Sequence, residues 1–365
     1  MSVTQKNIVV IGAGISGLST AWTLATAGYN ITIVFEKRAS ETVSSIAGAL
    51  WEWPPAVCGH HNDVKSLARS AAWAARSYDV FAEQSLWPGT GVHFRPSNFY
   101  FKNPVRESVI EWQKLSESAS HVRELIHDPE LITENGINED LGLQDAYRYL
   151  APVIETPIYS KWLHDKLRSR GVQFVNRKLT GRLSRDSELY SEFSADWIIN
   201  CAGLGADELT GDSLYPLRGA LIKFDLPSVN VERFSAAHCI ANDESIPQQN
   251  MVYIVPRSDC LLLGGFAEPN QWETNLTFDN YAEVKKVYQR GVEFFPRLKN
   301  LTISKSTPVL CGLRPARKAN VRLEIDESNR IVHNYGHGGS GYSLAWGCAE
   351  EVVNLIDDAA IGETP

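Results

Sequence analysis

Two glycine-rich segments and one arginine have residue types and spacing suited to chemistry. The first segment, IVVIGAGISGLSTA at residues 8–21, places Gly12, Gly14 and Gly17 between an apolar run and a helical pattern. In such a G-x-G-x-x-G turn the first glycine permits the tight bend, the second lets a pyrophosphate approach the main chain, and the third lets the helix pack on the strand. Partial positive charge at the helix N-terminus favours the same phosphates. The segment therefore predicts a dinucleotide site.

An acidic side chain follows the next apolar run, at a distance typical of a dinucleotide site. Glu36 comes directly after the strand-like run 31–35, nineteen residues after Gly17. A carboxylate at the end of that strand accepts hydrogen bonds from ribose hydroxyls. The pattern predicts a dinucleotide and leaves NAD and FAD open.

A second glycine-rich segment lies near the C-terminus, although such segments usually come first in a nucleotide-binding chain. Residues 334–347 read NYGHGGSGYSLAWG and combine a strand end, a glycine cluster and the start of a helical pattern. Bare glycines before a helix N-terminus let an anion or an electron-rich ring edge approach the main chain closely. We call residues 12–17 the first glycine turn and residues 336–341 the second glycine turn.

Arg314, in the segment LCGLRPAR at residues 310–317, is the side chain best suited to hold a substrate. A planar guanidinium binds a carboxylate through two parallel charge-assisted hydrogen bonds, which fix both its position and its orientation. The alternative is a structural arginine that donates to strand-end carbonyl groups. Arg317 and Arg322 are expected to serve structure or the surface.

The elements that must position these residues form an α/β pattern. A strand, a glycine turn, a helix and a second strand make a βαβ unit with parallel strands. A hairpin pattern covers residues 252–266, and no internal repeat or long linker separates the elements. We therefore expect interleaved sheets, with the nucleotide fold built from discontinuous segments. The expected strands are residues 8–12, 31–35, 93–102, 196–206, 217–226 and 321–325, and the expected helices are residues 15–28, 62–84 and 158–170.

The composition is that of an ordinary globular protein rather than a nucleic-acid or membrane protein. The chain has 365 residues, is 44% hydrophobic and 21% charged, and carries a formal net charge of −8. This charge argues against a general footprint on nucleic acid or anionic membranes. Six cysteines without a Cys-x-x-Cys pair are expected to be reduced thiols, with no metal site. With no signal peptide, no long apolar run and no SKL-type peroxisomal terminus, we expect a cytoplasmic protein.

Together the motifs resemble those of the D-amino acid oxidase family of flavoproteins. The resemblance extends over nearly the whole chain and implies FAD as the cofactor. It also implies the fold class: an FAD-binding Rossmann-like domain with a parallel sheet, interleaved with a substrate domain built on a mostly antiparallel sheet. The motifs that carry the resemblance are AGALW (47–51), CAG (201–203), YIVP (253–256), GLRPAR (312–317), HNYGHGGSGYS (333–343) and WGCA (346–349).

The resemblance further implies where FAD would lie. The first glycine turn would hold the pyrophosphate and the second the flavin ring, so that one cofactor spans both turns. Backbone dipoles at the second turn can stabilise the negative charge of a reduced flavin. By position, the cofactor-binding residues would be Gly12, Ala13, Gly14, Ser16 and Gly17 (pyrophosphate), Glu36 and Lys37 (ribose), Ser44 and Ser45 (phosphates), Gly48, Ala49 and Leu50 (isoalloxazine), Val172 (adenine), and Gly338, Gly339, Gly341, Tyr342 and Ser343 (pyrimidine edge).

For the substrate, the resemblance implies a carboxylate clamp made by two catalytic residues, Arg314 and the hydroxyl of Tyr253. The substrate α-carbon would transfer a hydride to flavin N5 without a side-chain base, so orientation is the main contribution of the protein. The resulting imine would hydrolyse to a 2-oxo acid and ammonia, and oxygen would reoxidise the flavin to give hydrogen peroxide. Gly339, Gln249 and Glu52 complete the expected substrate site, whereas His337 is expected to shape the backbone or support the site.

Two positions depart from the usual family pattern and bear on the substrate. Gln249 stands where a second tyrosine is common, and Glu52 stands where an uncharged amide is common. Residues 235–252 would form a polar lid that contains no arginine or lysine to pair with a second substrate carboxylate. Glu52 either favours a basic or amine-bearing substrate or is solvated, and neutral D-amino acids remain the default expectation.

Other interpretations stay open at this stage. One is a flavin oxidase of glycine, an N-methyl amino acid or a specialised carboxylate-bearing amine; others are an NAD-linked dehydrogenase and a non-catalytic flavin-binding protein. A D-amino acid and molecular oxygen are the expected partners, without nucleic acid or membrane, and a homodimer is one alternative for the assembly.

We expect an FAD-binding domain over residues 1–60, 150–220 and 305–365, and a substrate-binding domain over residues 61–149 and 221–304 with the lid at about 235–252.

Overall fold

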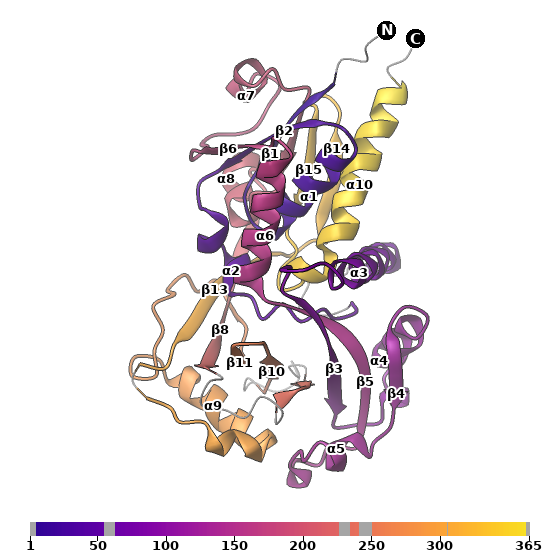
Figure 1. Ribbon diagram of the computed structural model, residues 1–365, viewed down its shortest axis with the longest axis vertical. Helices are drawn as coiled ribbons and strands as arrows, with labels where there is room; N and C mark the ends of the chain where they lie inside the picture. The colour runs from indigo at the N-terminus through magenta and orange to yellow at the C-terminus, as the bar shows by residue number, and fades with distance from the viewer. Residues whose placement is uncertain (1–4, 55–62, 226–233, 241–249, 305, 363–365) are drawn as a thin grey trace.

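The structure, a computed structural model, describes residues 5–54, 63–225, 234–240, 250–304 and 306–362. Within these ranges the strands form a six-stranded and a nine-stranded sheet. The six-stranded sheet lies at the end of the molecule where both termini lie, and the nine-stranded sheet lies toward the opposite end (Figure 1). The predicted fold class, a parallel sheet interleaved with a mostly antiparallel one, is confirmed.

Short apolar strands build the six-stranded sheet in the order β14-β15-β7-β1-β2-β6. Only β14 runs antiparallel to its neighbour, and the other pairs are parallel. Every residue of β7 and β15 is buried, as expected for a sheet that is covered on both faces. Its strands come from distant parts of the chain: β1 (Asn7–Ile11), β2 (Asn30–Phe35), β6 (Gln173–Asn176), β7 (Trp197–Asn200), β14 (Arg322–Asp326) and β15 (Ile331–Tyr335).

Helix α1 (Ile15–Thr26) connects β1 to β2 through the first glycine turn. Gly14 is the N-cap of α1. Gly28 follows its C-terminus with a φ of 97°, a conformation that favours glycine and ends the helix. The predicted helix over residues 15–28 is therefore confirmed, two residues shorter at its C-terminal end.

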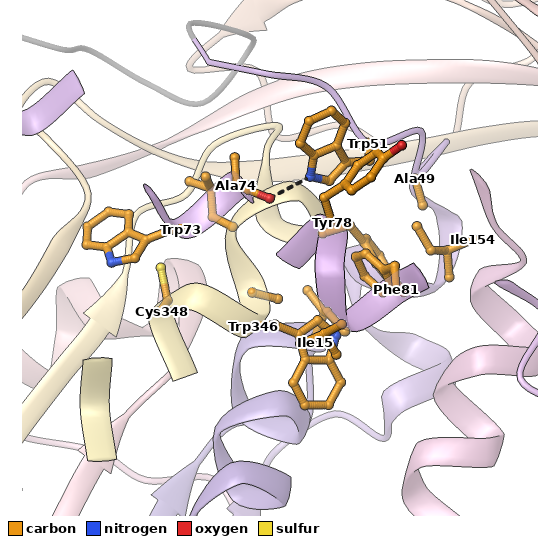
Figure 2. Packing of buried hydrophobic residues seen from close by; sticks show 14 of the residues in the cluster. Ile15, Ala49, Trp51, Trp73, Ala74, Tyr78, Phe81, Ile154, Trp346 and Cys348 are labelled. Atoms are coloured by element: carbon orange, nitrogen blue, oxygen red, sulfur yellow. Dashed lines mark hydrogen bonds between the residues drawn. The ribbon is translucent and has the colours of Figure 1, made fainter. Parts of the chain in front are cut away.

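The C-terminal helix α10 (Gly341–Gly362) packs against both α1 and α3 (Val64–Gln84). Its approach to α3 depends on Gly347, because a Cβ atom there would lie 2.3 Å from the Cα atom of Trp73. Figure 2 shows Trp73 and Cys348 in the apolar core at this contact. The second glycine turn is thus connected to a helix that is fixed by close packing.

The nine-stranded sheet has the order β12-β8-β11-β10-β9-β3-β5-β4, with β13 also paired to β8. All its pairs are antiparallel except β3 with β9. The predicted hairpin is confirmed, since β10 and β11 pair across the turn at residues 257–259. The strands are β3 (Val92–Phe101), β4 (Arg123–His127), β5 (Asp145–Ile154), β8 (Leu214–Asp225), β9 (Ala237–Ile240), β10 (Val252–Pro256), β11 (Cys260–Gly264), β12 (Glu268–Pro269) and β13 (Val309–Arg317).

The remaining helices match the sequence only in part. The helical patterns over 62–84 and 158–170 become α3 and α6, whereas α4 and α9 were not predicted. The predicted strand over 196–206 ends at Asn200, because a 3₁₀ helix forms over Gly203–Gly205. The remaining helices are α2 (Val43–Ile46), α4 (Val109–Ser118), α5 (Leu131–Glu134), α6 (Thr156–Ser169), α7 (Glu188–Glu192), α8 (Ala206–Thr210) and α9 (Ala282–Phe294).

No helix within the described part of the chain is long and apolar enough to cross a membrane. Half of the predicted lid, residues 241–249, lies outside the described residues. Gln249, the predicted substrate contact in this lid, falls in that half.

Candidate active site

Both sheets contribute to one cavity of about 920 Å³. The six-stranded sheet supplies the ends of β1 and β2, and the nine-stranded sheet supplies residues of β8, β10 and β13. Most residues predicted to bind FAD or substrate line this cavity. They are Gly12, Ala13, Gly14, Ser16, Glu36, Lys37, Ser44, Ser45, Gly48, Ala49, Leu50, Glu52, Tyr253, Arg314, Gly338, Gly339, Gly341, Tyr342 and Ser343.

Two predicted cofactor residues, Gly17 and Val172, are not among the residues that line the cavity. Gly17 is packed so closely on the end of β1 that a Cβ atom would lie 1.9 Å from the carbonyl oxygen of Gly12. This contact supports the packing role that the motif assigns to its third glycine. Val172 is buried in the main hydrophobic core, and its contact with adenine stays a prediction.

The first glycine turn presents the N-terminus of α1 to the cavity. Gly12 has a φ of 108°, which favours glycine, and its N–H donates to the carbonyl oxygen of Val34 at 2.8 Å. The hydroxyl of Ser44 accepts a hydrogen bond from the N–H of Ile15 at 3.0 Å. The helix N-terminus is therefore fixed against α2, where its partial positive charge favours an anion.

The second glycine turn is bound to the first turn and to the segment after it. The N–H of Gly338 donates to the carbonyl oxygen of Pro315 at 2.9 Å, so the turn is attached to β13. The hydroxyl of Tyr342 donates to the carbonyl oxygen of Ser44 at 3.1 Å. Nδ1 of His337 lies 3.4 Å from the hydroxyl oxygen of Ser16. The two glycine turns, more than three hundred residues apart in the sequence, thus border the same cavity.

Arg314 extends from β13 toward the space left by a glycine on β8. A Cβ atom at Gly219 would lie 2.2 Å from Nη1 of Arg314, so any other residue at position 219 would displace the guanidinium. Nη1 donates to the main-chain carbonyl oxygen of Phe266 at 3.3 Å, which is the contact expected of an arginine with a structural role. Among the described residues no carboxylate forms an ion pair with Arg314, and burial lowers the pKa of its guanidinium. An arginine still keeps its charge in a protein, so this cation can receive an external carboxylate.

Tyr253, on β10, occupies the space left by a second glycine. A Cβ atom at Gly48 would lie 2.3 Å from the ring of Tyr253. The Tyr253 hydroxyl oxygen accepts a hydrogen bond from the N–H of Leu50 at 3.1 Å. Burial raises the pKa of Tyr253, so its phenol stays protonated and its own hydrogen is available to a carboxylate in the cavity.

A family model described as FAD dependent oxidoreductase matches residues 7–355. The chain belongs to this family of FAD-dependent oxidoreductases. It is 33% identical over 355 residues to a D-amino-acid oxidase of Rubrobacter xylanophilus, with 96% of each chain covered. It is 31% identical over 356 residues to a D-amino-acid oxidase of Streptomyces coelicolor, with 95% of this chain and 96% of that one covered. The resemblance to the D-amino acid oxidase family is therefore confirmed.

Solved structures of other enzymes share the fold of this FAD-dependent oxidoreductase. Glycine oxidase from Bacillus cereus has a TM-score of 0.75 at 15% identity, covering 97% of this chain and 95% of that one. L-proline dehydrogenase from P. horikoshii has a TM-score of 0.75 at 15% identity, covering 97% of this chain and 94% of that one. At these identities the likeness shows the fold and does not decide among substrates.

FAD is the cofactor of this oxidoreductase, and the cavity fits it. The N-termini of α1 and α10 both open onto the cavity, so two helix ends are placed for the pyrophosphate and for an electron-rich ring edge. Nε2 of His337, on the cavity wall, is buried without a hydrogen-bond partner among the described residues. A buried polar atom without a partner is costly, and a polar cofactor in the cavity would supply one.

An arginine that was predicted only as part of a hairpin turn holds the cavity wall of this oxidoreductase. The buried side chain of Arg257 donates to the carbonyl oxygens of Ala47 at 2.6 Å and Gly48 at 3.2 Å. Nε1 of the buried Trp51 donates to the carbonyl oxygen of Ala74 at 3.0 Å, as Figure 2 shows. The segment 47–51 is therefore fixed from both sides. Position 257 carries no sequence signal for this role, because its partners lie about two hundred residues away.

Glu52, a predicted substrate contact, is ion-paired with a lysine that was not predicted. Nζ of Lys114, on α4, lies 2.6 Å from Oε1 of Glu52. The N–H of Glu52 donates to the hydroxyl oxygen of Ser343 at 3.2 Å. Glu52 lines the cavity, and its carboxylate is paired with Lys114 rather than alone; its contact with a substrate stays a prediction.

Buried histidines are expected to make the oxidoreductase less stable in mild acid. Burial lowers the pKa of both His333 and His337 to about 4, from an ordinary value of 6.5. As the pH is lowered, the histidines become protonated in the unfolded chain at a higher pH than in the folded protein. The free energy of unfolding is therefore highest above pH 6.5 and decreases as the pH falls toward 4. Between pH 6.5 and 5 the loss is roughly 2 kcal/mol per histidine.

Urea unfolding at pH 7, 6 and 5 measures this effect above the range in which most carboxylates titrate. His333→Gln should show a smaller loss of unfolding free energy between pH 7 and pH 5 than the wild type. Equal losses in the two proteins would show that His333 does not contribute to the acid sensitivity.

Proposed function

We propose that this protein oxidatively deaminates D-amino acids to 2-oxo acids, ammonia and hydrogen peroxide. The observation that carries the proposal is the buried cation of Arg314, which has no carboxylate partner among the described residues and lines the same cavity as both glycine turns. The relatives named D-amino-acid oxidase, which match nearly the whole chain, support the choice of substrate.

The proposed placement of FAD follows the two glycine turns. The first turn, from Gly12 to Gly17, would hold the pyrophosphate, together with Ser44 and Ser45. The other contacts would be Glu36 and Lys37 to the ribose, Val172 to the adenine, Gly48, Ala49 and Leu50 to the isoalloxazine, and Gly338, Gly339, Gly341, Tyr342 and Ser343 to its pyrimidine edge. In this arrangement β14, β15, β7, β1, β2 and β6 form the FAD-binding sheet, and the nine-stranded sheet presents the substrate.

The residues of the chain bind and orient the substrate in this proposal. The guanidinium of Arg314 would receive the α-carboxylate in two parallel hydrogen bonds, and the Tyr253 hydroxyl would donate a further one. Bound FAD supplies the acceptor for the hydride from the α-carbon. The free amine provides the electron pair that forms the imine, so no side chain has to remove a proton from carbon. The contribution of the two clamp residues is then orientation, which can supply several kcal/mol of the barrier reduction.

The proposal is tested by a peroxide-coupled assay of the purified yellow protein with paired D- and L-amino acids, glycine and sarcosine. We expect peroxide from D-isomers only, with an equal amount of ammonia. Peroxide mainly from glycine or sarcosine would instead support an oxidase of those amines. An intact flavin spectrum without turnover of any of these compounds would contradict the proposal.

A further inference from the structure

The ion pair between Glu52 and Lys114 is unusual because the cation is the more buried partner. The side chain of Lys114 is 6% exposed and that of Glu52 is 23% exposed. Nζ of Lys114 lies 5.7 Å from the centre of the Phe99 ring. Burial opposes the charge of Lys114, but the carboxylate of Glu52, foremost, and that of Glu111 outweigh it and hold the lysine pKa well above its ordinary value. The lysine is therefore charged at neutral pH.

The exposed side of this pair faces the cavity. Glu52 lines the cavity together with Arg314 and Tyr253, whereas Lys114 does not line it and lies against Phe99 of β3, in the nine-stranded sheet. Glu52 follows Leu50 by two residues, and the N–H of Leu50 donates to the Tyr253 hydroxyl oxygen. A substrate whose carboxylate is held by Arg314 and Tyr253 therefore has the rest of its atoms in a cavity that Glu52 borders.

The charge of Lys114 changes the electrostatic field that Glu52 exerts on a substrate in the cavity. A lone carboxylate on a low-dielectric wall would attract a cationic side chain strongly. An ammonium group 2.6 Å behind that carboxylate cancels most of its field, leaving a short dipole that still accepts hydrogen bonds. Without Glu52, in turn, Lys114 would be a buried cation with only the more distant carboxylate of Glu111 near it, and would favour an anionic side chain.

We propose that Lys114 is a specificity-determining residue, which neutralises Glu52 on the cavity wall so that the site prefers substrates with uncharged side chains. This inference rests on the proposed function and names its substrate class. Lys114 does not itself line the cavity, so it would act on the substrate only through its effect on the carboxylate of Glu52.

The test compares Lys114→Met with the wild type, both loaded with FAD, using D-lysine and D-norleucine. These substrates have side chains of similar length that differ by a terminal ammonium group. We expect the wild type to prefer D-norleucine, and Lys114→Met to raise kcat/KM for D-lysine relative to D-norleucine by about tenfold or more. The double variant Glu52→Gln with Lys114→Met removes both charges and should return the ratio to the wild-type value.

Two further variants keep the test decisive. Glu52→Gln leaves Lys114 charged and should raise kcat/KM for D-glutamate relative to D-glutamine, the opposite direction from Lys114→Met. Lys161→Met removes an exposed lysine that pairs with Asp165 on the surface, and should leave both ratios unchanged. If Lys114→Met does not bind FAD, the ratios of Glu52→Gln and of the double variant decide the matter.

A measurement without turnover separates this inference from the proposed function. Hexanoate and 6-aminohexanoate carry one carboxylate each and differ in a terminal ammonium group, and their affinities can be read from the flavin absorption spectrum. Tighter relative binding of 6-aminohexanoate by Lys114→Met, in a protein that oxidises no D-amino acid, would support the inference while the proposed function failed. Unchanged ratios in FAD-loaded Lys114→Met and Glu52→Gln, for substrates and for these ligands, would overturn it.

Discussion

Replacing Arg314 by methionine is expected to lower kcat/KM for a D-amino acid by about 10²–10⁴-fold, because two charge-assisted hydrogen bonds of roughly 1.5–3 kcal/mol each are lost. Methionine fills much of the same volume, so the space beside Gly219 is not left empty. The loss should appear in KM and in kcat together, since the clamp both binds the substrate and orients its α-carbon.

Steady-state kinetics and the affinity for a non-reacting carboxylate such as hexanoate check this expectation. Arg314→Lys keeps the charge but loses the planar two-donor geometry, so it should recover only part of the affinity and little of kcat. Arg76→Met removes a partly exposed guanidinium that pairs with Glu350 and does not line the cavity, and serves as the control with unchanged kinetics. Wild-type carboxylate affinity in Arg314→Met would mean that the guanidinium serves the carbonyl group of Phe266 and not the substrate.

The nucleotide fold was predictable because its determinants are local. The apolar run of β1, the spacing of Gly12, Gly14 and Gly17, and the helical pattern of α1 lie within one stretch of the chain. The local sequence preferences all favour the same structure: short buried strands, a turn that favours glycine, and a helix that ends before Gly28. The nine-stranded sheet was less predictable, because its strands pair across long sequence separations and alternate less regularly.

The candidate site was predictable only where a residue carries its own signal. Arg314 and the second glycine turn stand in distinctive motifs, and the structure places them on one cavity. Lys114 has no such signal, since it lies in α4, which the sequence did not predict, 62 residues from Glu52. A lysine in an amphipathic stretch is ordinarily expected at the surface, and only the packing of α4 shows that it is buried. Gly48 and Gly219 likewise show their role only when the side chains opposite them are placed.

Gly17→Ala is expected to have the largest effect on cofactor binding. A methyl group at position 17 would lie 1.9 Å from the carbonyl oxygen of Gly12. The obstacle is main chain and cannot rotate away, so α1 must move off the end of β1. Such overpacking costs roughly 3 kcal/mol. Because the same shift moves the helix N-terminus that faces the cavity, most of the cost should fall on the FAD-bound form, which corresponds to about a hundredfold weaker FAD binding.

Titration of the apoprotein with FAD, followed by flavin fluorescence, measures the affinity, and thermal unfolding with and without FAD measures the stability. Gly205→Ala is the matched control, because a Cβ atom there meets its nearest neighbour at an ordinary 3.7 Å. Because Gly205 also lines the cavity, it is the control for stability: it should leave the unfolding temperature without FAD close to that of the wild type. The two variants make the same chemical change, so a difference between them isolates the contact with Gly12. If Gly17→Ala bound FAD as tightly as the wild type, the close packing of α1 on β1 could not be what forms the anion site, and the first glycine turn would need another explanation.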